Sequence, residues 1–299
     1  MKVLVIVGPT GVGKTALSVG LAKKLNGEII SGDSVQVYKS LNIGSAKVTP
    51  EEMDGVVHHL VDFLDIEEEY SVARFQEEVR NKIEEITKRG KLPIICGGTG
   101  LYIKAALTEY EFDHSKRDMD YLSKFDDVPN EELHSILQEV DPESAEAFHP
   151  NNRRRVLRAI EYFEVNKEKI SSKKKGSVSL YDSCILGLRM NREQLYDRIN
   201  KRVDEMVTIG LLDEVESLRP FEEHINAIGY NEIFRYFSGL STLEDALEDV
   251  KRNSRRYAKR QFTWFSNQME TNWIEVDELT KSELIENAMK RLSKIGFIS

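Results

Sequence analysis

The chain has 299 residues, of which 40% are hydrophobic, so it is long enough for one large domain or two modest ones with a real core. Lys and Arg number 42 against 51 Asp and Glu, and the net charge of −9 excludes a uniformly basic protein that coats nucleic acid without discrimination. No apolar run reaches the roughly 18 residues that a membrane helix needs. Residues 1–7 do not resemble a signal peptide, so we expect a cytoplasmic protein without membrane contact.

The first 110 residues alternate between short apolar runs and helical patterns. The runs predict strands at 3–7, 28–30 and 92–96, and apolar residues at helical spacing predict helices at 14–25 and 71–89. Because two of the runs are continuously apolar, we expect strands that are covered on both faces, as in a parallel sheet flanked by helices. The predicted fold class is therefore α/β.

The middle of the chain, residues 113–181, differs in composition and is predicted to be a mostly helical insertion domain. It has no convincing strand pattern, and helical spacing is found around 133–140 and 154–164. Residues 171–177 are polar and of low complexity, which predicts a flexible loop.

The remaining residues, 1–112 and 182–299, are predicted to form one catalytic core. An apolar run at 184–188 returns the chain to the sheet. The elements predicted after it are helices at 192–209, 231–237 and 243–268, a strand at 273–276 and a helix from residue 282.

A phosphate-binding motif lies between the first predicted strand and the first predicted helix. The sequence GPTGVGKT at residues 8–15 fits the pattern G-x-x-x-x-G-K-[ST], the P-loop. Its glycines let backbone N–H groups converge on phosphate oxygens, Lys14 reaches the outer phosphates, and Thr15 offers a hydroxyl to Mg²⁺. The residues expected to bind phosphate are Gly8, Pro9, Thr10, Gly11, Val12, Gly13, Lys14 and Thr15.

The motif does not by itself indicate hydrolysis. A nucleotide hydrolase usually has an Asp at the end of another core strand, where it holds the metal-bound water. The strand at 92–96 is instead followed by GGTG, and the nearest substitute, Asp62, is more typical of a strand end or a cap. The hydrolase interpretation is disfavoured.

Asp33 follows the second predicted strand. Because the carboxyl ends of parallel strands form the ligand crevice, we expect its carboxylate beside the P-loop. There it could take a proton from an acceptor or hold a metal-bound water. The alternative is a turn or capping role, and spacing alone does not separate the two.

Two basic tracts interrupt the acidic background. Residues 153–175 contain nine Lys or Arg against three Glu, and residues 251–260 contain six with no acid. Such asymmetry suggests a phosphate-rich polymer as partner, whereas the alternative is a solvated helix face. Aromatic residues within and after the second tract favour nucleic acid, although Tyr257 and Phe265 also follow a helical stripe typical of a core. The first-tract residues expected to contact the polymer are Arg154, Arg155 and Arg158.

Together these motifs resemble the tRNA dimethylallyltransferase family, also called tRNA isopentenyltransferase, over nearly the whole chain. The most specific matches are GDSVQVY at 32–38, GGTGLY at 97–102 and NSRRYAKRQFTWF at 253–265. The resemblance implies transfer of a dimethylallyl group from its diphosphate to the exocyclic amine of the adenosine just 3′ of the anticodon. The P-loop would then hold the diphosphate that leaves.

The resemblance also implies roles for single residues. Asp33 would receive the amine proton, Lys14 would grip the diphosphate with Thr10 and Thr15, and Arg202 would stabilise the leaving diphosphate. On pattern alone, Arg202 would be a surface residue. The residues expected at the acceptor are Asp33, Ser34, Val35, Gln36 and Thr99. The expected cofactor is Mg²⁺, and the expected partners of a monomeric protein are dimethylallyl diphosphate and the tRNA anticodon stem-loop.

Three alternatives remain. Transfer of the same group to free AMP or ADP is one, but a mononucleotide would need neither the insertion nor two basic tracts. The second is a small-molecule kinase that uses ATP in the same loop with Asp33 as the acceptor base. The third is a switch or adaptor NTPase, which predicts slow hydrolysis and no prenyl transfer.

Overall fold

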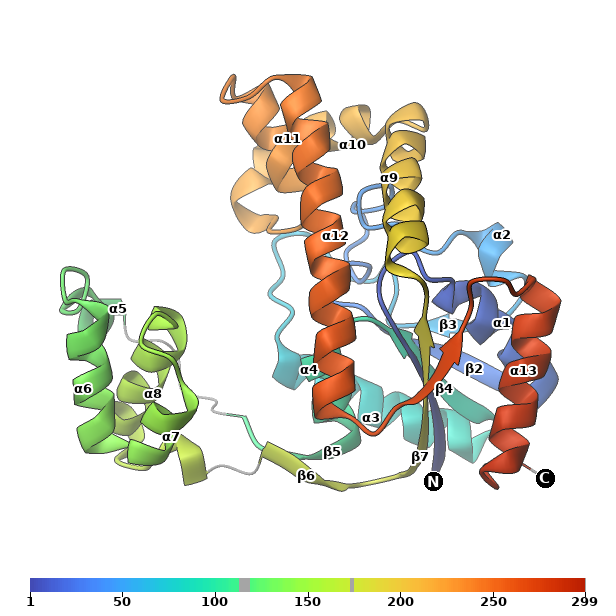
Figure 1. Ribbon diagram of the computed structural model, residues 1–299, viewed down its shortest axis with the longest axis horizontal. Coiled ribbons are helices and arrows are strands. Elements are labelled where there is room, and N and C mark those ends of the chain that lie inside the picture. The colour runs from blue at the N-terminus through green and yellow to red at the C-terminus, as the bar shows by residue number, and fades with distance from the viewer. Residues whose placement is uncertain (113–118, 173–174, 299) are drawn as a thin grey trace. The chain divides into compact units, whose positions relative to one another are not determined.

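The computed structural model describes residues 1–112, 119–172 and 175–298 (Figure 1). The chain divides into two compact units, which we name the core unit (Met1–Thr108 with Ser179–Ser299) and the helical unit (Glu109–Val178). These bounds lie close to the predicted borders of the insertion. No helix among the described residues is long and apolar enough to cross a membrane.

The core unit is built on a parallel sheet whose strands, within the described residues, run in the order β3-β2-β4-β1-β7-β8. The strands are β1 (Lys2–Val7), β2 (Gly27–Gly32), β3 (His58–His59), β4 (Leu92–Gly97), β7 (Asp182–Arg189) and β8 (Asn272–Glu275). All five predicted strands of this unit are confirmed, with ends that differ by one or two residues. The short β3 was not predicted.

Helices cover both faces of the sheet (Figure 1), so the predicted α/β class is confirmed. Side chains alternate across β1, because successive residues of a strand point to opposite faces. Leu4 and Ile6 pack with one pair of helices, and Val3 and Val5 pack with another. The first pair is α1 (Lys14–Leu25) and α13 (Lys281–Lys294), and the second is α3 (Val72–Lys88) and α4 (Gly100–Leu107).

A second group of helices stands over the carboxyl edge of the sheet (Figure 1). It consists of α9 (Arg192–Thr208), α10 (Leu211–Ser217), α11 (Tyr230–Phe237) and α12 (Leu243–Gln268). The predicted helices at 192–209, 231–237 and 243–268 are confirmed. A separate apolar core that includes Leu211, Val215 and Ile233 joins α10 and α11, and Phe221 of the 3₁₀ helix η2 (Arg219–His224) packs against it. The short helix α2 (Pro50–Met53) contacts α1 instead.

The helical unit packs its own core around Leu133, Leu137 and Val156. Its helices are α5 (Met119–Ser123), α6 (Asn130–Val140), α7 (Pro142–Ala147), α8 (Arg153–Asn166) and the 3₁₀ helix η1 (Ile170–Ser172). The expectation that this region has no strand is wrong. Strands β5 (Thr108–Tyr110) and β6 (Lys175–Ser179) pair in a small sheet, which backbone hydrogen bonds can form without the apolar alternation that a sequence pattern detects.

The predicted flexible loop at 171–177 is also partly wrong. Ser171 belongs to η1, where its backbone N–H and its hydroxyl both donate to the buried carboxylate of Asp141. Residues 175–177 belong to β6, and residues 173–174 lie outside the described residues. The prediction of a loop rested on polar composition alone. Composition does not reveal that the buried carboxylate of Asp141 fixes Ser171 by two hydrogen bonds.

The register of the sheet brings three loops together. Val7 and Gly32, the last residues of β1 and β2, both lie opposite Gly97, the last residue of β4. The P-loop after β1, the segment after β2 and the GGTG turn after β4 therefore begin side by side. In parallel sheets this edge is where ligands bind.

Candidate active site at the carboxyl edge of the sheet

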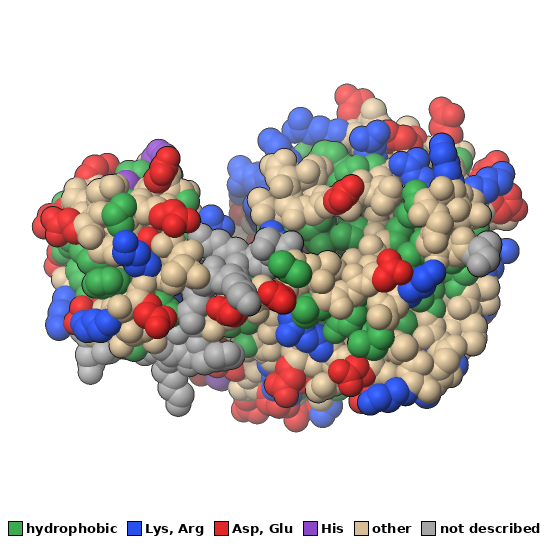
Figure 2. Space-filling view, turned by 90° about the horizontal axis from the view of Figure 1, so that it is seen from below, with side chains coloured by type: hydrophobic (Ala, Val, Ile, Leu, Met, Phe, Trp, Pro, Cys, Tyr) green, Lys and Arg blue, Asp and Glu red, His purple; other side chains and the backbone are tan. Residues whose placement is uncertain are grey.

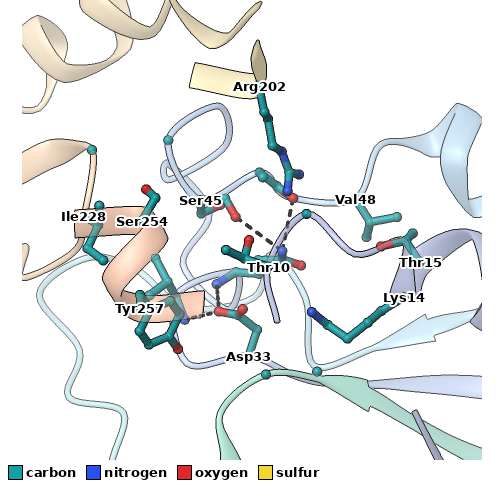
Figure 3. A pocket seen from close by; sticks show the side chains of 18 of the residues that line it. Thr10, Lys14, Thr15, Asp33, Ser45, Val48, Arg202, Ile228, Ser254 and Tyr257 are labelled. Atoms are coloured by element: carbon teal, nitrogen blue, oxygen red, sulfur yellow. Dashed lines mark hydrogen bonds between the residues drawn. The ribbon is translucent and has the colours of Figure 1, made fainter. Parts of the chain in front are cut away.

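A cavity of about 760 Å³ opens at this edge, within the core unit. Its walls come from the P-loop, the segment after β2, the loop before α2, the turn after β4, and the facing sides of α9 and α12 (Figure 3). The lining residues used below are Thr10, Gly11, Gly13, Lys14, Thr15, Asp33, Ser34, Val35, Gln36, Gly44, Ser45, Ala46, Gly98, Arg202, Tyr257 and Gln261.

The P-loop curls around its own lysine. Lys14 Nζ donates to the carbonyl oxygens of Gly8 and Pro9, each at 2.9 Å. Gly11 and Gly13 have φ of 81° and 104°, a region that favours glycine, so the turn depends on them. Of the eight predicted phosphate-binding residues, five line the cavity: Thr10, Gly11, Gly13, Lys14 and Thr15. The other three, Gly8, Pro9 and Val12, belong to the same turn but do not line the cavity.

Lys14 is an unusual cation. Its pKa is lowered from 10.5 to about 8, chiefly by burial and to a smaller degree by the charge of Arg202, while Cys96 and Asp33 act in the opposite direction. Two cations therefore face a cavity whose nearby anions do not fully offset them. A diphosphate bound in the cavity would offset the positive charges of both Lys14 and Arg202.

Asp33 combines a turn conformation with a place in the cavity wall. Its Oδ1 accepts from the backbone N–H groups of Val35 (2.8 Å) and Gln36 (3.3 Å), as a turn aspartate does. Within the described residues Oδ2 has no hydrogen-bond partner, and the side chain lies in the cavity between Tyr257 and Lys14 (Figure 3). The turn thus holds Oδ1, whereas Oδ2 is not used by the turn.

Arg202 faces the same cavity from α9. Its side chain extends into the cavity from the side opposite the sheet (Figure 3), although pattern alone would have placed it on the surface. Burial lowers the pKa of its guanidinium, and the charges of Glu52, Glu205 and Asp33 oppose that effect. A guanidinium stays charged under these conditions, so it supplies a fixed positive charge above the P-loop.

The residues expected at the acceptor divide into two groups. Ser34, Val35 and Gln36 line the cavity, and the Gln36 side-chain amide donates to the carbonyls of Ser45 (3.3 Å) and Ala46 (3.1 Å). Thr99 is not among the lining residues.

The Thr99 hydroxyl is instead buried beside the Tyr257 phenol, without a hydrogen bond of normal geometry among the described residues. Its neighbour Gly98 lines the cavity in its place.

Sequence reasoning missed two residues of α12. Tyr257 was expected in a core stripe, but it is half-buried and lines the cavity (Figure 3), whereas Phe265 is fully buried as expected. Gln261, four residues after Tyr257, accepts from Thr10 N at 2.8 Å and donates to the Gly98 carbonyl at 3.1 Å. A buried glutamine on the same helix face as Tyr257 was the available signal.

Asp62, the nearest substitute for a hydrolase carboxylate, lies outside the lining of the cavity. It has φ of 58°, and its Oδ1 lies 2.6 Å from Lys47 Nζ. The preference for a structural role is therefore confirmed.

Part of the basic tract at 251–260 is neutralised within the fold. Lys251 pairs with Asp204 at 2.8 Å, Arg252 pairs with Asp249, and Arg255 donates to Asn200 at 2.6 Å. Arg256, Lys259 and Arg260 are exposed, and so is the paired Arg252. On the face drawn in Figure 2, basic and acidic side chains are interspersed, so the charge asymmetry of the sequence does not become one continuous basic surface there.

The basic tract on α8 is likewise mixed in role. Arg153 donates to the backbone carbonyls of Phe125 and Val128 and so closes the helical unit. Arg158 pairs at 2.8 Å with Glu161, whose side chain is fully buried. Arg154 and Arg155 are exposed. These two are the residues of the predicted set best placed to meet a partner.

A P-loop at the carboxyl edge of a parallel sheet places this chain in the class of P-loop proteins. A carboxylate and a guanidinium face the same cavity. The family model described as IPP transferase matches residues 36–268. The chain belongs to the IPP transferase family.

Known relatives cover nearly the whole chain. A tRNA dimethylallyltransferase of Bacillus anthracis is 54% identical over 294 residues, which are 95% of this chain and 94% of the relative. The crystal structure of a tRNA isopentenylpyrophosphate transferase from Bacillus halodurans is similar with a TM-score of 0.76 at 44% identity, and it covers 98% of this chain and 96% of that one. A eukaryotic dimethylallyltransferase, captured acting on tRNA, gives a TM-score of 0.82 at 32% identity over 97% of this chain and 77% of its own.

Proposed function

We propose that this protein transfers a dimethylallyl group from dimethylallyl diphosphate to the exocyclic amine of the adenosine 3′ of the anticodon in tRNA, with release of diphosphate. The names of the relatives support the reaction class. The observation that carries the proposal is the cavity that brings Lys14, Arg202 and the open oxygen of Asp33 together.

The reaction balances with the groups that line the cavity. The amine nitrogen forms a bond to the allylic carbon, and the bond from that carbon to the diphosphate oxygen breaks. The amine proton passes to the Asp33 carboxylate, because the lone pair of an adenine amine is delocalised and a base must act as the new bond forms. The negative charge that develops on the diphosphate is met by Lys14 and Arg202.

Thr15 is the residue proposed to contact Mg²⁺, which would neutralise charge on the diphosphate. Its hydroxyl lines the cavity beside Lys14. The described residues contain no group of three or more His, Cys, Asp or Glu side chains that could hold a metal ion. We propose that Mg²⁺ enters with the diphosphate, whose oxygens would add ligands to the Thr15 hydroxyl.

The proposed acceptor is tRNA rather than a free mononucleotide. Exposed cations on α12 and α8, among them Arg256, Lys259 and Arg155, provide phosphate contacts that AMP or ADP would not use. We propose that the protein acts as a monomer and in the cytoplasm.

The test is direct. The protein is incubated with labelled dimethylallyl diphosphate, Mg²⁺ and either undermodified tRNA or AMP, and the products are digested to nucleosides. The proposal predicts label on adenosine from tRNA and little on AMP. Label on AMP alone would support the mononucleotide alternative, and phosphate transfer from ATP to a small acceptor without prenyl transfer would support a kinase.

A further inference from the structure

A loop that lines the acceptor side of the cavity is held by a carboxylate from outside it. Glu214 lies on α10, and its Oε2 accepts from the backbone N–H groups of Asn42 (3.1 Å) and Ile43 (2.8 Å). Its Oε1 accepts from the N–H of Gly44 at 3.0 Å. Three consecutive N–H groups that converge on one carboxylate form a preorganised anion cradle.

Tyr230, the first residue of α11, closes this arrangement. Its hydroxyl donates to Glu214 Oε1 at 2.7 Å, and its side chain is fully buried. A Cβ atom at Gly44 would lie 2.6 Å from ring atoms of Tyr230, so the loop packs against the ring where only glycine fits. Burial raises the pKa of Tyr230, as does the nearby Glu214, so the phenol stays a donor.

The loop at residues 42–46 also orients Gln36, whose backbone N–H contacts the proposed base, Asp33. The carbonyls of Ser45 and Ala46 accept from the Gln36 side-chain amide, and Gln36 N–H donates to Asp33 Oδ1 at 3.3 Å. A connected set of hydrogen bonds therefore runs from Glu214 to Asp33. Apolar contacts would stabilise α10 on the loop equally well, whereas a hydrogen-bonded carboxylate fixes the direction of each N–H.

We propose that Glu214, together with Tyr230, is a positioning residue that fixes loop 42–46 and, through Gln36, holds the acceptor adenosine in line with Asp33. This inference rests on the proposed function. It predicts that Glu214 governs the acceptor side of the reaction and not the P-loop side, because the set of hydrogen bonds does not include Lys14 or Thr15.

The test compares Glu214→Gln and Tyr230→Phe with a control, Glu216→Gln, which makes the same charge change at an exposed position of the same helix. Three quantities are measured: the affinity for dimethylallyl diphosphate, the melting temperature, and the single-turnover transfer rate with both substrates saturating. In Glu214→Gln, an amide NH₂ replaces one of the two oxygens and must face N–H donors, so the loop at residues 42–46 should shift. We expect the transfer rate to fall about 10- to 100-fold, because small misplacements of reacting groups reduce rates by this factor. Tyr230→Phe removes only one hydrogen-bond donor to Glu214, so its transfer rate should fall by a smaller factor.

In all variants, the affinity for dimethylallyl diphosphate should stay within about twofold of that of the unmodified protein. A general loss of structure would lower the transfer rate and this affinity together. The inference is overturned if Glu214→Gln transfers at a rate less than about tenfold below that of the control, or if it loses diphosphate affinity in proportion. If Glu214→Gln does not fold, Tyr230→Phe decides: a reduced transfer rate with normal diphosphate affinity supports the inference, and an unchanged rate overturns it. Absence of transfer by the unmodified protein would instead refute the proposed function.

Discussion

Lys14 is the residue whose state should respond most to the donor. It lines the same cavity as Arg202, and its pKa is about 8. Among the described residues, its ammonium donates hydrogen bonds to the carbonyls of Gly8 and Pro9 and to no other oxygen. A bound diphosphate raises the pKa of an adjacent ammonium because it stabilises the charged form. Binding of the donor should therefore take up a proton above pH 8.

The prediction is that affinity for dimethylallyl diphosphate is nearly constant below pH 8 and falls by about tenfold for each pH unit above it. Lys14→Met should bind the donor more weakly at pH 7 and lose this pH dependence, while tRNA affinity stays unchanged. Isothermal titration calorimetry of donor binding, at pH values from about 7 to 9.5, measures this pH dependence. A pH dependence that persists in Lys14→Met would assign it to another group.

The sequence predicted the site residues that closely follow strands, including those in the first turn of α1, and missed the residues in the middle of α12. Asp33 and Lys14 were placed together correctly because the carboxyl ends of parallel strands must meet. Tyr257 and Gln261 could not be placed in this way, since the side of α12 that faces the cavity depends on how the helix crosses the sheet. Arg202 was assigned only through the family resemblance, for the same reason.

At the scale of elements, a buried ionic cluster ties β2 to its neighbours. Glu28 is 3% exposed and contacts His59, Arg89 and Lys91. Burial alone would raise its pKa, but hydrogen bonds from Lys91, His59 and Arg89 outweigh burial and lower the pKa of Glu28 to about 2. The folded state therefore favours the ionised carboxylate.

Because this pKa is depressed, its contribution to stability is complete above the ordinary value of 4.5 and is lost as the pH falls toward 2. We expect Glu28→Gln to lower the free energy of unfolding by about 2 kcal/mol at pH 7 and by clearly less at pH 3.5. Urea titrations at both pH values measure this. The control is Glu84→Gln, which removes an exposed ion pair with Lys88 and should cost under about 1 kcal/mol at either pH. An equal loss at both pH values for Glu28→Gln would contradict the assignment.

The basic residues of α12 divide into those that pair with acids and exposed ones for which the described residues show no ion pair. If the exposed ones contact tRNA phosphates, replacing Arg256 and Lys259 with Gln should make the plot of log affinity against log salt shallower by about 1.5 units. Replacing Lys251 and Arg252, which pair with acids, should change the slope less. Filter-binding titrations from low to high salt compare the two, and equal slopes for both double variants would remove this face from the tRNA footprint.

Long elements were predictable because each buries one face and so carries a periodic apolar pattern. The 26-residue helix α12 matched its predicted bounds. The strands β3, β5 and β6 were missed because they are short, and their backbone pairing leaves little trace in side-chain composition.

At the scale of the whole molecule, the two units have different relations to the proposed chemistry. The core unit alone supplies the described cavity, whereas the helical unit contributes exposed cations on α8. Replacing Arg154 and Arg155 with Gln should weaken tRNA binding and reduce its salt slope by about 1.5 units, while affinity for dimethylallyl diphosphate stays unchanged. An unchanged slope would exclude these two arginines from the footprint.

The central claim is that one cavity holds the diphosphate on the P-loop while Asp33 takes the amine proton. Single-turnover transfer on preformed complexes of the unmodified protein and Asp33→Asn tests it most directly. Asparagine can still accept from Val35 and Gln36 N–H, so the turn and both affinities should persist, yet it cannot take the proton. The account predicts a rate about 10² to 10⁴ times lower. A folded Asp33→Asn protein that keeps more than about a tenth of the normal rate would contradict it.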